Sequence, residues 1–363
     1  MKKILLQVPS PFFANNHIFE KQGTANNTLD SWYRLKNKLL DLGYELTTAD
    51  DNNLDNCAGI IFYEANSLDK KPKISSRLIN LLRTIFRKKP LKSYPSRKMY
   101  QEAVEAGLKD KIVLLIWEGP SVCPENFHKE TWDKFDHIII WDDNLVKKDK
   151  RFIHYCMPME SHQTLPATIP FNQKKLLVNI SYNKFSYDKN ELYSARRKSI
   201  EYFSKHFPDD FDLYGIRWDQ PVTRIQRLFP FTVKKYPTYR GKAMDKLGTL
   251  SQYKFNLCYE NNSGTIGRIT EKIFNAIKAG TVPIYWGSEN IQDYIDKNVF
   301  VDRREFDNDE RLAKFIVNMK ELEYEKYIQA GARYISSPKY KMFLPDSFCN
   351  RMVEILKEIK IIS

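Results

Sequence analysis

Short apolar runs alternate with helical patterns along the first half of the chain. Runs that suit buried strands lie near residues 3–8, 58–62, 112–117 and 137–141. Apolar residues recur at helical spacing between them, over residues 31–42 and 100–107. Strands and helices in alternation indicate a mostly parallel sheet that is covered by helices. The first half therefore predicts an α/β domain.

The second half repeats this alternation after a proline-rich interval. Residues 157–170 contain three prolines and little apolar periodicity, which predicts a linker. The elements predicted after it are a strand over 175–181, a helix over 193–207, a strand over 211–214 and a final helix over 346–360. The length suits two domains. We expect an N-terminal domain over 1–165, a second domain over 166–345 and a C-terminal helix over 346–363.

Residues 253–287 carry the densest pattern in the chain. The sequence YKFNLCYENNSGTIGRITEKIFNAIKAGTVPIYWG predicts a strand, a polar loop, a helix that Gly280 ends, and a second strand. Thr270 stands where a helix N-cap belongs, so Glu271 and Lys272 fall in the first helical turn. A helix N-terminus at the carboxyl end of a parallel strand is a place where phosphorylated ligands bind. The alternative is an ordinary strand–helix–strand unit with a solvated helix start.

Three pieces of this segment, YKFNLCYEN, TEK and AGTVPIYWG, resemble the donor-site signature of the α1,3-fucosyltransferase family (glycosyltransferase family 10) in a bacterial-type member. The resemblance implies the GT-B architecture, with two Rossmann-like αβα domains facing a central cleft and a C-terminal helix closing the pair. It implies an inverting hexosyltransferase that moves L-fucose from GDP-fucose to a glycan hydroxyl. No metal or other cofactor is expected, because GT-B enzymes usually stabilise the leaving group with side chains and a helix dipole.

The same resemblance implies a donor-binding role for a group of residues. Lys272 and Arg197 would contact the diphosphate, with the adjacent Arg196 as an alternative to Arg197. Glu271 would accept hydrogen bonds from the ribose hydroxyls. The remaining residues expected at the donor are Glu260, Asn261, Arg268 and Thr270.

Glu118 is the candidate general base. It directly follows the apolar run IVLLIW and precedes Gly119-Pro120, so its carboxylate is expected on a loop at a strand's carboxyl end. The segment WEGP resembles the E-S-P segment of the family, whose glutamate is taken as the base. Asp142 and Asp143 follow another apolar run and are the alternatives. If Glu118 has no catalytic role, it is an ordinary acidic residue in a loop next to a Gly-Pro turn.

The chain departs from the family pattern at positions where the sugar of the donor is expected to bind. The family commonly has a serine where this chain has Gly119, and an acid and an aromatic where it has Gly267 and Arg268. Phosphate and ribose recognition are therefore better supported than fucose itself. Two alternatives stay open, a GT-B enzyme for another GDP-linked deoxysugar and a non-catalytic glycan- or membrane-binding relative.

The charge of +13 is concentrated in one region. Residues 70–111 hold 13 Lys or Arg against three acids, and part of this segment has an amphipathic pattern. Such a pattern suits either an anionic membrane surface or a core-packed helix with a basic face. No nucleic-acid motif accompanies the charge, so nucleic acid is not expected as a partner. The sequence does not indicate an oligomeric state.

Cysteine and histidine usage points away from metal sites and disulfides. The five cysteines are scattered, the histidines lack zinc spacing, and two D-x-D pairs fall short of a full ligand set. No apolar run approaches the roughly 20 residues that span a bilayer. We expect a cytoplasmic enzyme, free or peripheral on the inner membrane, that takes part in lipopolysaccharide or other surface glycan synthesis, or in protein glycosylation.

Overall fold

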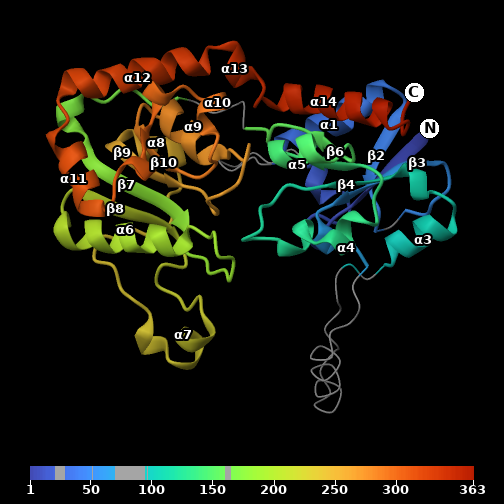
Figure 1. The fold of residues 1–363 in the computed structure, drawn as a ribbon, viewed down its shortest axis with the longest axis horizontal. Helices are drawn as coiled ribbons and strands as arrows, with labels where there is room; N and C mark the ends of the chain where they lie inside the picture. Colours follow the sequence, from blue (N-terminus) through green and yellow to red (C-terminus); the bar gives the residue numbers. More distant parts are fainter. Residues whose placement is uncertain (21–28, 51, 70–94, 96, 160–164) are drawn as a thin grey trace. The chain divides into compact units, whose positions relative to one another are not determined.

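The computed structural model describes residues 1–20, 29–50, 52–69, 95, 97–159 and 165–363. The chain divides into two compact units, drawn in Figure 1. Unit 1 comprises the described residues of Met1–Gln22, Leu29–Tyr155 and Phe348–Ser363, and unit 2 those of Cys156–Ser347. The boundary expected after residue 165 stays a prediction. Most of the basic segment 70–111 lies outside the described residues, which begin again at residues 95 and 97.

Unit 1 is built on a six-stranded parallel sheet in the order β2-β1-β3-β4-β5-β6. Its strands are β1 (Lys2–Gln7), β2 (Tyr44–Thr48), β3 (Cys57–Tyr63), β4 (Ile112–Leu115), β5 (Ile138–Ile140) and β6 (Phe152–His154). The α-helices described in this unit before the C-terminus are α1 (Asp30–Asp41), α3 (Met99–Glu105), α4 (Lys129–Trp132) and α5 (Asp143–Lys148). The strand centres are continuous apolar runs, and they are buried because helices lie on both faces of the sheet (Figure 1).

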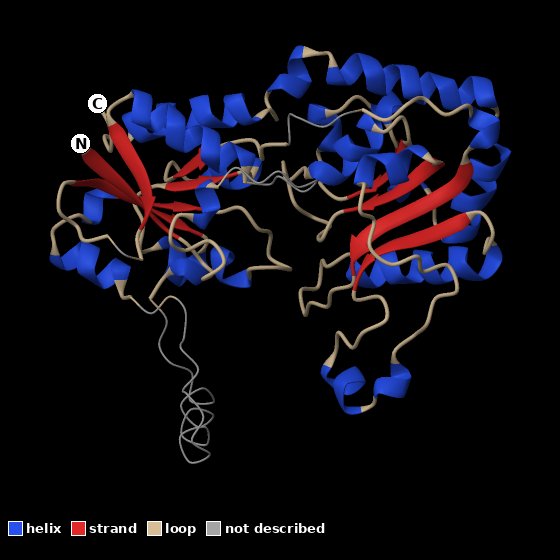
Figure 2. Cartoon of the chain, turned by 180° about the vertical axis from the view of Figure 1, so that it is seen from behind, coloured by secondary structure: helices blue, strands red, loops and turns tan. Residues whose placement is uncertain are grey.

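Unit 2 contains a five-stranded parallel sheet in the order β11-β10-β9-β7-β8, visible as red arrows in Figure 2. Its strands are β7 (Lys175–Tyr182), β8 (Phe211–Ile216), β9 (Tyr253–Tyr259), β10 (Val282–Trp286) and β11 (Val301–Asp302). Its helices are α6 (Tyr193–His206), α7 (Arg224–Leu228), α8 (Lys246–Ser251), α9 (Glu271–Lys278), α10 (Ile291–Tyr294), α11 (Asp309–Asn318), α12 (Glu321–Ile335) and α13 (Pro338–Lys341). Helices α6 and α11 cover one face of the sheet, and α8 and α9 cover the other (Figure 1).

The last helix, α14 (Pro345–Glu358), returns the chain to unit 1. The ring of Phe348 lies 6.1 Å from that of Trp32, 5.9 Å from Trp117 and 5.8 Å from Tyr155. The Cys349 thiol also donates to the backbone carbonyl of Ser31 at 3.5 Å. The predicted C-terminal helix is present, and from Phe348 onward it belongs to the N-terminal unit.

The α/β class with parallel sheets in both units is confirmed. The sequence pattern missed two strands of unit 1, β2 and β6, because YELTT and FIH are too short to stand out from their surroundings. It also extended β4 by two residues to Trp117. Among the described residues, no helix combines the length and the apolar character that crossing a membrane requires.

Candidate functional site

The segment 253–287 folds as a strand–loop–helix–strand unit in which β9 leads to α9 and then to β10. Strands β9 and β10 pair in parallel, with Leu257 opposite Ile284. Helix α9 begins at Glu271, and its apolar residues Ile273, Phe274 and Ile277 are buried. The carboxyl ends of parallel strands share one edge of the sheet, so the loop after β9 and the start of α9 lie together there.

A buried carboxylate, that of Glu260, organises this loop. Glu260 is 1% exposed. Its carboxylate accepts hydrogen bonds from the Thr270 N–H at 3.0 Å, the Thr270 hydroxyl at 2.7 Å and the Lys272 ammonium at 2.9 Å. The Arg268 guanidinium lies 3.9 Å away. Thr270 occupies the expected N-cap position, but its hydroxyl donates to Glu260 and makes no capping hydrogen bond to the helix. A buried charge requires such partners, so Glu260 ties Thr270 and Lys272 to the end of β9.

Glu271 is the acid of the first helical turn. Its side chain is 42% exposed, and the Lys246 ammonium lies 3.8 Å from its carboxylate. Desolvation opposes ionisation, but the charges of Lys272 and Lys246 and the helix's own backbone N–H outweigh it and lower the pKa of Glu271 to about 2. At neutral pH Glu271 is therefore an ionised acceptor that is partly open to solvent.

The two adjacent arginines of α6 point to different partners. Arg196 is buried, and its guanidinium donates to the carbonyls of Tyr259 at 2.6 Å and Glu260 at 2.9 Å. Its Nε finds no hydrogen-bond partner within the described part of the chain. Arg197 is half-buried and donates to the Lys184 carbonyl at 2.7 Å. The structure thus brings Arg196 to the Glu260 loop and Arg197 to the loop that follows β7.

Positive charge exceeds negative charge around the start of α9. We call the charged residues here the α9 cluster, which consists of Arg196, Lys246, Glu260, Arg268, Glu271 and Lys272. Its four cations face two carboxylates. A small cavity beside the cluster is lined by Lys246, Lys272 and Asn256, whose buried Oδ1 has no hydrogen-bond partner among the described residues. A surplus of cations at a helix N-terminus is suited to an anionic ligand.

The rest of the loop after β9 is held by its backbone. The carbonyl of Asn261 accepts from the Leu192 N–H at 2.9 Å. Gly267 has φ 87°, and its N–H donates to the Ser288 hydroxyl at 2.8 Å and to Asn290 Oδ1 at 2.7 Å. A residue with a side chain is strained at that φ. The glycine at this position is therefore explained by the path of the loop.

In unit 1, Glu118 lies just past the end of β4, as the sequence predicted. Its backbone N–H donates to Glu64 Oε1 at 2.7 Å, and the Trp117 N–H donates to the same oxygen at 3.0 Å. The side-chain amide of Asn126 donates to the Glu118 carbonyl at 3.1 Å and also to Glu64 Oε2. The loop that carries Glu118 is therefore clamped by two buried polar side chains.

Glu64 follows β3 directly and was not expected at the site. Its backbone φ of 71° is unusual for a residue other than glycine. It is buried, and burial is the main reason that its pKa rises to about 8; the nearby charge of Glu118 adds to this rise, and the three N–H donors oppose it. A strained, buried carboxyl beside the candidate base is typical of a functional site.

The alternative bases have structural partners. Asp142 caps α5, since its carboxylate accepts from the backbone N–H groups of Asn144 at 3.0 Å and Leu145 at 2.9 Å. The Asp143 carboxylate lies 3.2 Å from His154 Nε2. No group of three or more His, Cys, Asp or Glu side chains among the described residues is arranged to hold a metal ion.

Comparison with known proteins places this geometry in a family. Residues 186–360 match the family model described as glycosyltransferase family 10 (fucosyltransferase) C-term. This matched region, which is just under half of the chain, belongs to glycosyltransferase family 10. The match contains the whole α9 cluster and both arginines of α6.

Individual fucosyltransferases align with the chain over short segments. The chain is 45% identical over 67 residues to the α-(1,3)-fucosyltransferase FucT of Helicobacter pylori, which is 18% of this chain and 14% of that protein. It is 37% identical over 67 residues to an α-(1,4)-fucosyltransferase of Arabidopsis thaliana, again 18% of this chain and 16% of the relative. The aligned segments thus span less than a fifth of the length of these relatives.

Solved structures resemble the chain over nearly its whole length. An α1,3-fucosyltransferase with GDP has a TM-score of 0.50 at 15% identity, covering 98% of this chain and 90% of that one. A glycosyltransferase from Rickettsia africae ESF-5 has a TM-score of 0.50 at 12% identity, covering 99% and 98%. At these identities the likeness concerns the fold alone, and it confirms the GT-B class.

The sequence indicated the segment of the site but not Glu64 and Asn126. Arg196 is the arginine at the Glu260 loop, and the preference for Arg197 as the phosphate ligand stays a prediction. One signal for Glu64 was available: YEAN places an acid directly after an apolar strand, as WEGP does for Glu118. Asn126 gave no comparable signal.

Proposed function

We propose that this chain transfers L-fucose from GDP-fucose to a hydroxyl group of a glycan acceptor with inversion. The observation that carries the proposal is the α9 cluster, a cationic helix start inside the family match. A leaving diphosphate gains negative charge as the sugar departs, and fixed cations at a helix N-terminus stabilise that charge. The proposed enzyme is thus a fucosyltransferase whose donor site lies in unit 2.

The donor roles follow from charge and exposure. Lys272 keeps part of its side chain exposed while Glu260 holds its ammonium, which supports a phosphate contact. Arg197, on the loop side of α6, is the second phosphate ligand. Glu271 is ionised and partly exposed, which suits hydrogen bonds from the ribose hydroxyls. The other donor residues proposed are Glu260, Asn261, Arg268 and Thr270, of which Glu260 and Thr270 act by placing Lys272.

Glu118 is proposed as the general base. In a single displacement it takes the proton of the acceptor hydroxyl while that oxygen bonds to the anomeric carbon, and the bond from that carbon to the diphosphate breaks. GDP leaves with the electron pair. The clamp formed by Glu64 and Asn126 supports this role, because a base acts only when it is held in position.

The domain roles are part of the same proposal. Residues 1–165 would bind the acceptor, residues 166–345 the nucleotide sugar, and residues 346–363 would form the closing helix. We propose surface polysaccharide or lipopolysaccharide synthesis at the cytoplasmic face of the inner membrane as the setting, without a metal requirement. The basic segment 70–111 would contact an anionic membrane.

One experiment tests the donor and the base together. GDP binding is measured by calorimetry, and transfer is measured as GDP release from GDP-fucose in the presence of fucose-accepting oligosaccharides. Lys272→Ala should weaken GDP binding by roughly ten-fold or more, since a charge-assisted contact is lost. Glu118→Gln should bind GDP as the wild type does and lose about 10²- to 10⁴-fold in transfer. Full turnover by Glu118→Gln would remove Glu118 as the base.

Another GDP-linked deoxysugar is the second candidate donor. Gly267 and Arg268 stand where the family pattern has an acid and an aromatic, so the part of the loop expected near the sugar differs. Thermal-shift measurements with a panel of nucleotide sugars separate the two donors. Stabilisation by GDP without turnover of any GDP-sugar would favour a non-catalytic, glycan-binding relative.

A further inference from the structure

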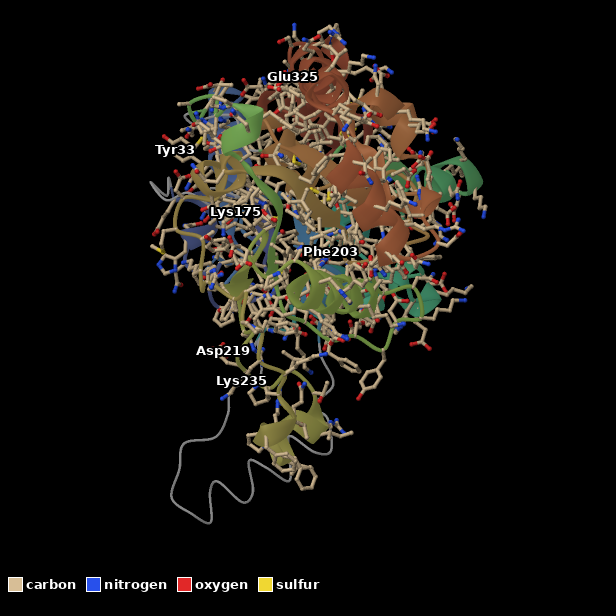
Figure 3. All side chains as sticks on the ribbon, turned by 90° about the vertical axis from the view of Figure 1, so that its left-hand side faces the viewer. Tyr33, Lys175, Phe203, Asp219, Lys235 and Glu325 are labelled. Atoms are coloured by element: carbon tan, nitrogen blue, oxygen red, sulfur yellow. The ribbon has the colours of Figure 1, made fainter. Side chains whose placement is uncertain are left out.

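Helix α7 and the turn after it form a folded protrusion between β8 and α8. We call residues 224–235 the tip. Figure 3 labels Asp219 and Lys235 near its base, from which the segment extends away from the sheet of unit 2 (also Figure 1). The tip has its own hydrogen bonds: Thr223 and Gln226 form a capping box, and the Phe229 N–H donates to the Ile225 carbonyl at 2.8 Å. The tip is therefore an ordered element.

The tip exposes large apolar side chains. Ile225 is 66% exposed, Leu228 74%, Phe229 50% and Phe231 85%. Residues 225, 228 and 229 have the i, i+3, i+4 spacing of one helix face. The rings of Phe229 and Phe231 lie 5.9 Å apart, so Phe231 adjoins this face. A concentrated apolar surface of this kind marks an interaction site.

The core of unit 2 ends at the base of the protrusion. Trp218 is buried and donates to the Ser181 carbonyl at 2.8 Å, and its ring lies 5.7 Å from that of Tyr236. These aromatic residues anchor the protrusion to the sheet. The apolar side chains of the tip lie beyond this anchor and remain exposed.

Positive charge surrounds the apolar side chains. Between Asp219 and Asp245 the chain has six Lys or Arg and no Asp or Glu. Arg224, Arg227 and Lys235 are exposed, while Lys234 pairs with Glu201 at 2.8 Å. Two identical tips would bring like charges together, which disfavours a second copy as the partner. Apolar side chains ringed by basic ones are suited to an anionic bilayer.

We propose that the tip is a membrane-contact surface that inserts Ile225, Leu228, Phe229 and Phe231 into the interface of a bilayer containing anionic lipids. The neighbouring arginines and lysines contact the lipid phosphates. This surface consists of residues other than the basic segment 70–111, and the proposal does not rest on the transferase activity.

Vesicle co-sedimentation of the full chain tests the proposal. Phosphatidylcholine vesicles are compared with vesicles that contain about one-third phosphatidylglycerol, at low and high salt. The wild type should bind the anionic vesicles, more weakly at high salt. Leu228→Gln with Phe231→Gln should reduce binding about ten-fold or more, since binding scales with buried apolar area. The control pair is Val317→Gln with Leu322→Gln, two exposed apolar residues on α11 and α12, which should bind as the wild type does.

Hydrogen exchange measured by mass spectrometry locates the contact. Backbone amides of residues 224–233 should be protected by anionic vesicles and unaffected by phosphatidylcholine alone. Equal loss of binding in the tip pair and the control pair overturns the proposal. Protection of the same amides without lipid, rising with protein concentration, would assign the tip to a second copy and would also overturn it.

Discussion

At the scale of single residues, two buried glutamates shape the candidate site. Glu260 has polar and cationic partners: the Lys272 ammonium and the Thr270 hydroxyl lie within hydrogen-bond distance, and Arg268 is close. Within the described part of the chain, Glu64 accepts from three neutral N–H groups and has no cationic partner, and burial raises its pKa. The same side chain thus has cationic partners in unit 2 and neutral donors in unit 1.

Glu64 predicts a pH dependence of stability. Its pKa is about 8 in the folded protein and ordinarily 4.5. Between these values the folded state keeps a proton that the unfolded state has released, so unfolding is favoured as pH rises from about 5 to 8. Glu64→Gln, which stays neutral, should show a smaller fall in Tm over this range. The slope of Tm against pH is the readout, and parallel slopes for the two proteins would show that Glu64 is not the titrating group.

Arg196 and Arg197 are expected to respond differently to replacement by lysine. Arg196→Lys should lower the Tm by roughly 3–12 °C, because one ammonium cannot reproduce the paired bonds of the buried guanidinium to two carbonyls. Arg197→Lys should leave the Tm unchanged and weaken GDP binding by roughly ten-fold. Calorimetry and thermal unfolding on both variants check this. If Arg197→Lys bound GDP normally, Arg197 would be excluded as a phosphate ligand.

At the scale of elements, the β9–α9–β10 unit depends on the close packing of Gly287 against Glu260. Gly287 follows β10, and a Cβ built there would lie 2.5 Å from Glu260 Cγ and 2.5 Å from the Tyr285 hydroxyl oxygen. All three residues are buried, so a side chain at 287 must push against Tyr285 and against the Glu260 side chain that holds Thr270 and Lys272. Glycine at this position is required by packing.

Gly287→Ala is therefore expected to disturb the proposed donor site by shifting residues that pack against Gly287. Overpacking of this kind costs about 1–3 kcal/mol of stability. GDP affinity should fall as well, because Lys272 loses the position that Glu260 gives it. Calorimetry on protein shown to be folded by circular dichroism checks the prediction. A folded variant with wild-type GDP affinity would show that the placement of Glu260 is not needed for binding.

At the scale of the whole molecule, the chain leaves unit 1 after Tyr155 and returns to it at Phe348. Unit 1 is therefore completed by residues that follow the whole of unit 2. Phe348 is buried within an aromatic group that includes Trp32, Trp117 and Tyr155. The stability of unit 1 depends on this last helix.

Phe348→Ala should destabilise unit 1 by about 3–5 kcal/mol, the usual cost of removing a buried phenyl ring. GDP binding, which is proposed for unit 2, should persist under conditions where unit 1 is still folded. Denaturant unfolding followed by tryptophan fluorescence reports on Trp32 and Trp117, which contact the ring that the substitution removes. The exposed Met342 serves as a control, since Met342→Ala should change stability by less than about 1 kcal/mol.

The sequence predicted which segments form the candidate site, but it did not predict the contacts between their side chains. Thr270, Glu271 and Lys272 lie where the helical pattern placed them, and Glu118 lies past a strand end as expected. The pairing of Glu64 with Asn126 was not predictable, because the two residues are 62 positions apart. Tip residues 225, 228 and 229 show the same spacing as a buried helix face, so the pattern could not reveal that they are exposed.

The order of residues by itself determined the α/β class, the placement of α9 and the resemblance to family 10, because periodicity and motifs are local properties of the chain. Only the tertiary structure decided which arginine supports Glu260, that Glu64 is a buried acid beside Glu118, that α14 belongs to unit 1, and that the tip is exposed. Burial and pairing arise from contacts between residues that are distant along the chain. They set the pKa values, the charge balance and the free surfaces on which function depends.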